Sequence, residues 1–502
     1  MGPIKVNVKW SGKKFEDLEL DPAESVLTFK TQLFSVTGVE PERQKILTKG
    51  GVLKDDTNLA NLNLKDGHTF MMMGTAGELP KAPEKKVVFM EDMSDAQLYK
   101  AYDIPGGLEN LGNTCYLNAT LQCLRAVPEL RERLQKFSGR TGQTADPDVS
   151  LTAALRDLYK DLDTHPDGFS PFVFVQKLRT MYPKFAQIDN ETKSYSQQDA
   201  EECWTELVSV LRSQLKNGSG AGPSDQSVIE QYMSGEMAVK LSCDDNPEEP
   251  STTKTEPFFK LNCHIDRETN YLSTGLKAAL TEKLTKRSPS LDRDADYTRT
   301  STITRLPAYL MVSFIRFFWK ADNAVQAKIL RKVKFPMDLD MAEFCAPELQ
   351  EKMRPAKEYL REVDEQKSMV AKKNKRAKLE ANDTAMQVDG GESSGDKKEG
   401  KETSTTDHPK SPKVPELDKS LKEDPGCNPS GQYELCAVLT HQGRATNSGH
   451  YIAWVRKRDS DDWFKFDDDK VSMVKEADIE KLSGGGDWHT AYVCLYRAKK
   501  FP

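Results

Sequence analysis

The sequence of 502 residues contains no apolar run of about 18 residues, which is close to the shortest helix that spans a membrane. It also lacks the basic stretch and apolar core of a secretory signal peptide. Position 6 holds Val6, where N-myristoylation of Gly2 would require serine or threonine. The sequence therefore predicts a protein with no membrane partner.

The nine cysteines include no Cys-x-x-Cys pair. Such pairs supply the ligands of many structural zinc sites, and Cys243 and Cys263 are too isolated to complete a set of four ligands. We therefore expect no metal ion and no cofactor. Cysteines that must stay reduced also favour a cytoplasmic location and permit a nuclear one.

Neither sign of charge dominates the chain. Its 72 lysines and arginines stand against 78 aspartates and glutamates, which gives a formal net charge of −6. A nucleic-acid-binding protein would be expected to carry a basic excess. The composition therefore predicts no nucleic-acid partner, and the length predicts two or three domains.

One cysteine stands out by its position at the start of a predicted helix. Cys115 lies in Gly-Asn-Thr-Cys-Tyr, after which Leu117, Leu121 and Leu124 recur at helical spacing and Pro128 ends the run. Unpaired N–H groups and the positive end of the helix dipole favour a thiolate at this place. The alternative is a buried structural cysteine, the usual state of a free cysteine. Cys115 is therefore a candidate nucleophile.

A second segment supplies a candidate base. His450 lies at the start of a predicted strand, a polar turn follows near residue 459, and a second strand covers residues 463–467. Antiparallel pairing across this turn places His450 opposite Asp467 or Asp468. A carboxylate there would hold the imidazole in the orientation needed to accept a proton from a thiol. The pattern predicts a Cys–His–Asp triad in which Asp467 and Asp468 remain rivals.

The motifs around these residues resemble those of the ubiquitin-specific proteases, papain-like thiol hydrolases that cleave at the C-terminus of ubiquitin. The matching segments are the cysteine box 107–118, the segment 197–202, the strand region 306–317, the histidine box 433–451 and the strands 463–468 and 491–496. The resemblance implies a catalytic domain at 105–498. It would have a helical thumb bearing Cys115, an antiparallel palm bearing His450 and Asp467, and strand-rich fingers.

The resemblance also implies roles for the triad and for one residue before it. Cys115 would be the nucleophile, His450 the general base and then acid, and Asp467 the orienting carboxylate. Asn110 matches the position that helps to stabilise the oxyanion. Without the resemblance, a helix cap or a turn residue would be the preferred interpretation of Asn110.

Two acidic residues match positions that hold the extended tail of ubiquitin. Asp199 and Glu202 would accept hydrogen bonds from the arginines and backbone N–H groups of that tail. The alternative is that both lie on a solvated helix face.

Residues 1–76 read as a separate domain. Alternating apolar residues predict strands at 4–10 and 15–20, helical spacing predicts a helix at 26–36, and further strands are expected at 44–47 and 69–73. This order resembles the ubiquitin-like β-grasp fold. The chain continues past Gly74 with no terminal Gly-Gly, so we expect a docking domain and not a released modifier.

The domain order, with residues 77–104 as a linker, resembles that of the proteasome-associated member of the family. This implies that the N-terminal domain docks on the proteasome regulatory particle. It also implies that the enzyme trims ubiquitin and polyubiquitin from substrates held there.

Three kinds of segment remain. An insertion at about 355–431 is charged and poor in aromatics, and it is expected to be disordered, as are 217–226 and 244–256. The basic run at 372–378 fits a nuclear signal or a solvated tail. Residues 310–332 mix apolar and basic residues, which fits a calmodulin target or a core strand.

The sequence as a whole predicts an α+β protein that is a thiol-dependent deubiquitinase. Two alternatives remain. The chain could be an inactive ubiquitin receptor, or it could be an enzyme that acts on another ubiquitin-like modifier.

Overall fold

The computed structural model describes residues 2–48, 51–62, 64–75, 103–142, 146–165, 167–190, 192–216, 226–320, 325–386, 412–445, 448–458, 460–486 and 488–502. The chain divides into an N-terminal unit, Met1–Met93, and a C-terminal unit, Ser94–Pro502. Nearly all of the predicted linker 77–104 and of the predicted disordered stretch 217–226 lies outside the described residues. Within those ranges, no helix has the length and apolarity needed to cross a membrane.

The N-terminal unit is a five-stranded sheet in the order β2-β1-β5-β3-β4, with one helix packed on it. β1 and β5 are parallel, and the other pairs are antiparallel. The elements are β1 Ile4–Trp10, β2 Lys13–Leu20, α1 Val26–Thr37, β3 Lys45–Thr48, β4 Gly51–Val52 and β5 His68–Met73. These elements confirm the strand and helix order that the sequence predicts.

In the N-terminal unit, the residues that cap the helix and the residues that form the core are those expected from the sequence pattern. Ser25 caps α1 by accepting a hydrogen bond from Thr28 N, and Gly38 ends the helix at φ 69°. Val6 and Val8 alternate with polar residues in β1 and are fully buried in the same core as Phe29. The helix and the sheet therefore share one apolar core.

The C-terminal unit is built around the palm, an eight-stranded sheet in the order β18-β17-β16-β15-β19-β11-β8, with β14 added beside β15. Only the β11–β8 pair is parallel. The strands are β8 Leu261–Cys263, β11 Tyr309–Phe314, β14 Asp338–Asp340, β15 Gln432–Ala445, β16 Ser448–Arg456, β17 Asp462–Asp467, β18 Lys470–Lys475 and β19 Thr490–Ala498.

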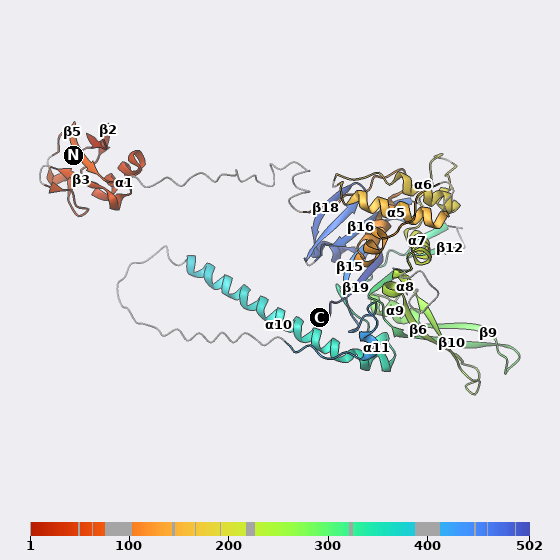
Figure 1. Ribbon diagram of the computed structural model, residues 1–502. Coiled ribbons are helices and arrows are strands. Elements are labelled where there is room, and N and C mark those ends of the chain that lie inside the picture. Colours follow the sequence, from red (N-terminus) through yellow and green to blue (C-terminus); the bar gives the residue numbers. More distant parts are fainter. Residues whose placement is uncertain are drawn as a thin grey trace. The chain divides into compact units, whose positions relative to one another are not determined.

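Helices cover both faces of the palm. Alternate residues of β16 enter two cores: Tyr451 and Ala453 pack with the thumb helices, whereas Ile452 and Trp454 pack on the opposite face with α9, α10 and α12. The thumb helices are α3 Cys115–Arg125, α4 Pro128–Gln135, α5 Pro147–Leu162, α6 Phe172–Met181, α7 Ala200–Gln214 and α8 Val228–Met233. The remaining helices are α9 Leu272–Leu280, α10 Pro347–Met386, α11 Lys419–Lys422 and α12 Glu476–Glu480. Figure 1 shows α5, α6 and α7 gathered beside β15, β16 and β19.

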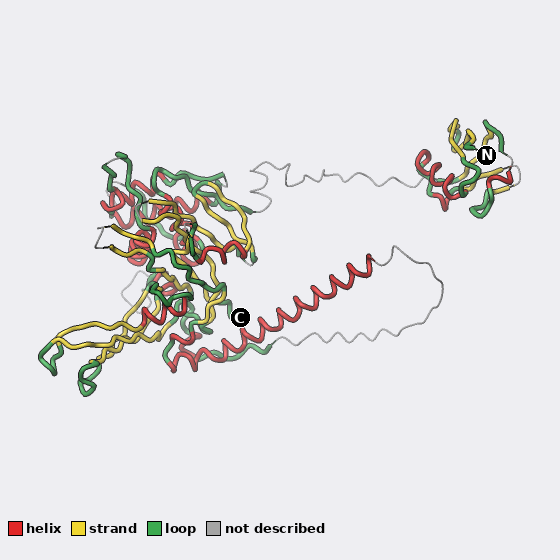
Figure 2. The backbone as a smooth tube through the Cα atoms, turned by 180° about the vertical axis from the view of Figure 1, so that it is seen from behind, coloured by secondary structure: helices red, strands yellow, loops and turns green. Residues whose placement is uncertain are grey.

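The fingers are a second sheet, in the order β7-β6-β10-β9, whose long strands extend away from the palm (Figure 2). Its strands are β6 Gly235–Cys243, β7 Thr252–Phe258, β9 Thr281–Arg287 and β10 Asp294–Arg305. The prediction of disorder at 244–256 is wrong, because Glu249 accepts a hydrogen bond from Tyr297 OH at 2.6 Å and β7 pairs with β6 from Thr252 onward. Backbone pairing to a long neighbouring strand orders a segment with little apolar content of its own.

The prediction of a disordered insertion at 355–431 is also wrong over much of its length. The helix α10 runs to Met386, with Ala356 fully buried and Leu360 7% exposed, and Cys427, Asn428 and Ser430 are buried at the other end. Tertiary contacts supply the apolar burial that composition alone does not reveal. Residues 387–411 lie outside the described residues, as do the side chains of the basic run 372–378.

The segment 310–332 is not the amphipathic helix that a calmodulin target requires. It contains most of β11, which is wholly buried, and a separate hairpin of β12 Phe317–Lys320 and β13 Val325–Lys328. The structure therefore agrees with the core-strand alternative.

Candidate active site

Cys115 is the first residue of α3 and is 2% exposed. The turn before it is tight, with Gly112 at φ 87° and Asn113 at φ 56°. The preceding Thr114 does not cap the helix with its side chain, because its Oγ1 accepts a hydrogen bond from Leu111 N at 2.9 Å. The helix therefore begins at the sulfur-bearing residue, as the sequence predicts.

His450 joins the cysteine to a carboxylate. Its Nε2 lies 2.7 Å from Asp467 Oδ1, and the Cys115 thiol is the second hydrogen-bonding partner of the ring. The hydrogen bond to Asp467, followed by that to Cys115, raises the pKa of His450 to about 10. Hydrogen bonding to His450 holds the pKa of Asp467 well below its usual range. The three predicted triad residues thus come together, with an imidazolium at their centre at neutral pH.

The structure separates the two rival aspartates. The β16–β17 register pairs Ala453 with Phe466, so the position opposite His450 falls beyond the end of β17, and the bond to Asp467 is diagonal. Asp468 instead occupies the turn before β18 at φ 55°. Asp467 is therefore the carboxylate that contacts the imidazole.

Asp468 does not contact His450 but forms hydrogen bonds to the cysteine segment, a role that the sequence did not predict. Its carboxylate accepts hydrogen bonds from Asn110 Nδ2 at 2.9 Å and Asn118 Nδ2 at 2.8 Å, and its carbonyl accepts one from Leu108 N at 2.9 Å. These bonds join the cysteine loop and α3 to the turn that follows Asp467. Asp468 therefore ties the nucleophile segment to the base segment.

Asn110 lies in the same loop, five residues before the cysteine. Its Oδ1 accepts hydrogen bonds from the N–H groups of Gly112 at 3.0 Å and Thr114 at 3.1 Å, while its Nδ2 donates to Asp468. Asn110 therefore stabilises the turn before the helix. Its role in binding the oxyanion stays a prediction, for which the second hydrogen of its side-chain amide would be the donor.

Asp199 acts as the N-cap of α7. It accepts hydrogen bonds from Glu201 N at 2.7 Å and from Tyr492 OH at 2.7 Å, and burial raises its pKa. Glu202, in the first turn of α7, pairs with Lys184 at 2.7 Å and keeps 46% of its side chain exposed. Contact of either carboxylate with a substrate tail stays a prediction.

Three further residues surround the triad and had no role in the sequence interpretation. Gln197 Oε1 lies 3.9 Å from Cys115 Sγ, and Lys465 Nζ donates to Asp467 Oδ2 at 3.0 Å. The ring of His489 lies 6.1 Å from that of His450, and burial lowers its pKa to about 4, so it stays neutral beside the imidazolium. Gln197 belongs to the segment 197–202, which the sequence analysis identified as a family motif. Nothing in the sequence indicates a role for Lys465, on β17, or for His489, just before β19.

Among the described residues, no group of three or more His, Cys, Asp or Glu side chains could hold a metal ion.

A thiol, an imidazole and a carboxylate in this arrangement can attack an acyl carbon and protonate its leaving group.

Comparison with known proteins gives matches along nearly the whole chain. Residues 106–496 match the family described as ubiquitin carboxyl-terminal hydrolase, and residues 4–77 match the ubiquitin family. The predicted α+β combination of a ubiquitin-like domain and a hydrolase domain is therefore confirmed.

Three full-length relatives illustrate the similarity. The chain is 41% identical to ubiquitin carboxyl-terminal hydrolase 7 of Arabidopsis thaliana, with 99% of each chain covered. It is also 41% identical to ubiquitin carboxyl-terminal hydrolase 6 of Schizosaccharomyces pombe, again with 99% of each covered. It is 35% identical to ubiquitin carboxyl-terminal hydrolase 14 of Caenorhabditis elegans, over 99% of this chain and 94% of the relative.

Proposed function

Because this chain belongs to the ubiquitin carboxyl-terminal hydrolase family, whose members are cysteine proteases, we propose that Cys115, His450 and Asp467 are its catalytic triad. The observation that carries the proposal is the imidazole held between the Asp467 carboxylate and the Cys115 thiol. A buried structural cysteine would have no need of an imidazole fixed by a carboxylate.

The reaction follows from this geometry. The Cys115 thiolate attacks the carbonyl carbon of the terminal glycine of ubiquitin, and an S–C bond forms. The His450 imidazolium gives its proton to the leaving lysine amine as the C–N bond breaks. His450 then takes a proton from a water that attacks the thioester, which releases the ubiquitin carboxylate and the thiolate. Asn110 and the backbone N–H of Cys115 would stabilise the oxyanion in both steps.

The substrate is ubiquitin or polyubiquitin, and Glu202 at the start of α7 is the more exposed of the two carboxylates proposed to meet its arginine-bearing tail. Asp199, buried between the start of α7 and Tyr492, would hold the tail-binding part of α7 in place.

We further propose that the enzyme trims ubiquitin chains at the proteasome in the cytoplasm and the nucleus, with the N-terminal unit as the docking element. The match of residues 4–77 to the ubiquitin family supports this role. So does the absence of a Gly-Gly pair at the end of this domain, where Gly74 is followed by Thr75, because a released modifier would need that terminus.

The decisive experiment uses ubiquitin with an electrophile in place of its terminal carboxylate. The native chain should form a covalent adduct, Cys115→Ala should form none while still binding ubiquitin, and the control Cys243→Ala should react like the native chain. Binding without any adduct would indicate an inactive receptor. Reaction only with another modifier's electrophile would identify a different substrate.

A further inference from the structure

A basic cleft of about 740 Å³ lies where the C-terminal ends of α3 and β16 meet. Six cationic side chains line it, against the two acidic residues Asp103 and Asp163. The cationic residues are Arg125, Arg131, Arg456, Lys457, Arg458 and Arg497. Arg125 and Arg456 lie at the ends of α3 and β16, and the others come from the middle of α4, the turn after β16 and β19, so distant parts of the chain converge on one place.

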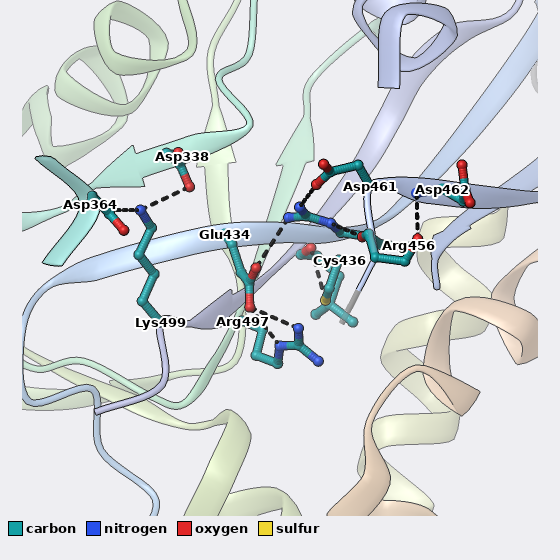
Figure 3. Close-up of polar contacts among 11 residues, drawn as sticks. Asp338, Asp364, Glu434, Cys436, Arg456, Asp461, Asp462, Arg497 and Lys499 are labelled. Atoms are coloured by element: carbon teal, nitrogen blue, oxygen red, sulfur yellow. Dashed lines mark hydrogen bonds and ion pairs between the residues drawn. The ribbon is translucent and has the colours of Figure 1, made fainter. Parts of the chain in front are cut away.

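The carboxylates around the cleft are too few to neutralise its arginines. Asp163 is shared by Arg125 at 2.5 Å and Arg131 at 2.9 Å. On the palm side, Glu434 is shared by Arg456 at 3.1 Å and Arg497 at 2.7 Å, as Figure 3 shows. Two carboxylates therefore serve four guanidinium groups.

The remaining acidic neighbours change this balance little. Asp461 also contacts Arg456, but its side chain is 88% exposed, so solvent screens the pair. Asp103 lies on the lining and is offset by Lys457 and Arg458. The cleft keeps an excess of positive charge.

Besides the excess of positive charge, Arg125 provides a second and independent indication that the cleft binds a ligand. Its side chain is 11% exposed, and its Nε is buried without a hydrogen-bond acceptor among the described residues. A buried donor is normally paired, and an oxygen of a ligand in the cleft would satisfy it.

We propose that this cleft binds a small molecule carrying two or more phosphate groups. Guanidinium groups hold phosphate oxygens in pairs, and several arginines converging on one place suit a ligand with several phosphates. The cleft has the volume of an ordinary small-molecule site, and Val455, Phe464 and Phe466 add an apolar part to its lining.

The proposed site is separate from the triad but shares its elements. α3 begins at Cys115 and ends at Arg125, roughly 15 Å away along the helix axis. β16 carries His450 near its start and Arg456 at its end. A bound polyphosphate would bridge the thumb and the palm without contacting the reacting atoms.

The test measures binding of inorganic tripolyphosphate to the full chain by calorimetry, with sulfate at the same ionic strength as reference. We expect saturable binding and a raised melting temperature with tripolyphosphate alone. Arg131→Gln and Arg458→Gln should each weaken binding at least fivefold. Arg267→Gln, an exposed arginine outside the cleft, should leave it unchanged. Far-ultraviolet circular dichroism verifies that each variant is folded.

Two further probes fix the class of ligand. If ADP binds more tightly than tripolyphosphate, the cleft also recognises the nucleoside part of the ligand. If tripolyphosphate binds more tightly, the cleft recognises the phosphate groups alone. Either result supports the proposed site. The proposal is overturned if neither probe exceeds sulfate or if Arg267→Gln weakens binding equally. It is also overturned if an oligoglutamate peptide binds while both phosphates fail, because the cleft would then be a peptide site.

Discussion

At the scale of single residues, the two neighbouring aspartates have different partners. Asp467 contacts the imidazole, and Asp468 accepts hydrogen bonds from two asparagines of the nucleophile segment. We expect Asp467→Asn to lower turnover of a ubiquitin–fluorophore conjugate by about 10²–10⁴-fold, since the uncharged amide cannot balance the charge of the imidazolium and can hold the ring in the wrong tautomer. Asp468→Asn keeps one acceptor oxygen and should cost about tenfold or less. A larger loss in Asp468→Asn would assign the main catalytic role to that carboxylate.

The sequence predicted that Cys115 and His450 come together with one of these aspartates, but it could not choose between the two carboxylates. A hairpin brings both near His450, and the choice depends on a register that a polar turn does not fix. The position directly opposite His450 lies beyond β17, so the bond that forms is a diagonal one. The roles of Lys465 and His489 depend on side-chain directions, and no motif encodes those.

The raised pKa of His450 predicts a dependence of stability on pH. Its value of about 10 in the folded protein lies above the value of about 6.5 expected in the unfolded chain. The charged imidazole therefore stabilises the fold fully below about pH 6.5, and this contribution is lost as the pH rises through about 10. Solvent screens part of the effect, because the side chain is 34% exposed.

Urea unfolding of the native chain and of His450→Gln between pH 6.5 and 10 measures this contribution. We expect the free energy of unfolding to fall more steeply with pH in the native chain than in the variant. Parallel curves would show that the imidazole gains no net charge stabilisation from its partners.

At the scale of elements, the β15–β16 hairpin depends on a glycine beside the catalytic histidine. Gly449 has φ 116°, and a Cβ there would collide with the Gln442 carbonyl oxygen and lie 2.9 Å from His441 Nε2. We expect Gly449→Ala to shift His450 and lower turnover at least tenfold, with a loss of about 1–3 kcal/mol in stability. Gly486→Ala, which meets no atom within 4 Å, is the matched control and should keep both properties.

The first part of α10 is a packed element. Met353 is 1% exposed, whereas Met369 on the same helix is 70% exposed. Met353→Ala should lower the free energy of unfolding by about 2–5 kcal/mol, because it opens a cavity, and Met369→Ala should change it by no more than about 0.5 kcal/mol. Chemical denaturation measures both, and equal effects would mean that α10 does not pack as described.

The error at α10 has a physical origin. Nearly half of the residues of this helix are charged, and the few apolar residues that anchor it, such as Met353 and Leu360, are spaced among lysines and glutamates. Composition averages over the segment, whereas packing depends on one face. The strands β1 and β5 were easier to predict, because buried residues alternate with more exposed ones along each of them.

At the scale of the whole molecule, the triad and the proposed docking domain belong to different units. Deletion of residues 1–76 should leave the rate of reaction with the ubiquitin electrophile within about twofold, since Cys115, His450 and Asp467 all lie in the C-terminal unit. The same deletion should abolish most co-sedimentation with proteasomes. Undiminished co-sedimentation would place docking in the C-terminal unit.

The positions of the cysteines offer a way to measure the unfolding of this protein in solution. All nine cysteines are free, buried and located in the C-terminal unit, and the first 93 residues contain none. Burial raises the pKa of Cys203, Cys263 and Cys436, among others, so they resist alkylation until their surroundings open. Apart from Cys115, whose thiol is proposed to react in the folded enzyme, the number of modified thiols therefore reports the unfolding of the C-terminal unit alone. Mass spectrometry of partly alkylated chains can therefore time the opening of the hydrolase unit, however early or late the ubiquitin-like unit unfolds.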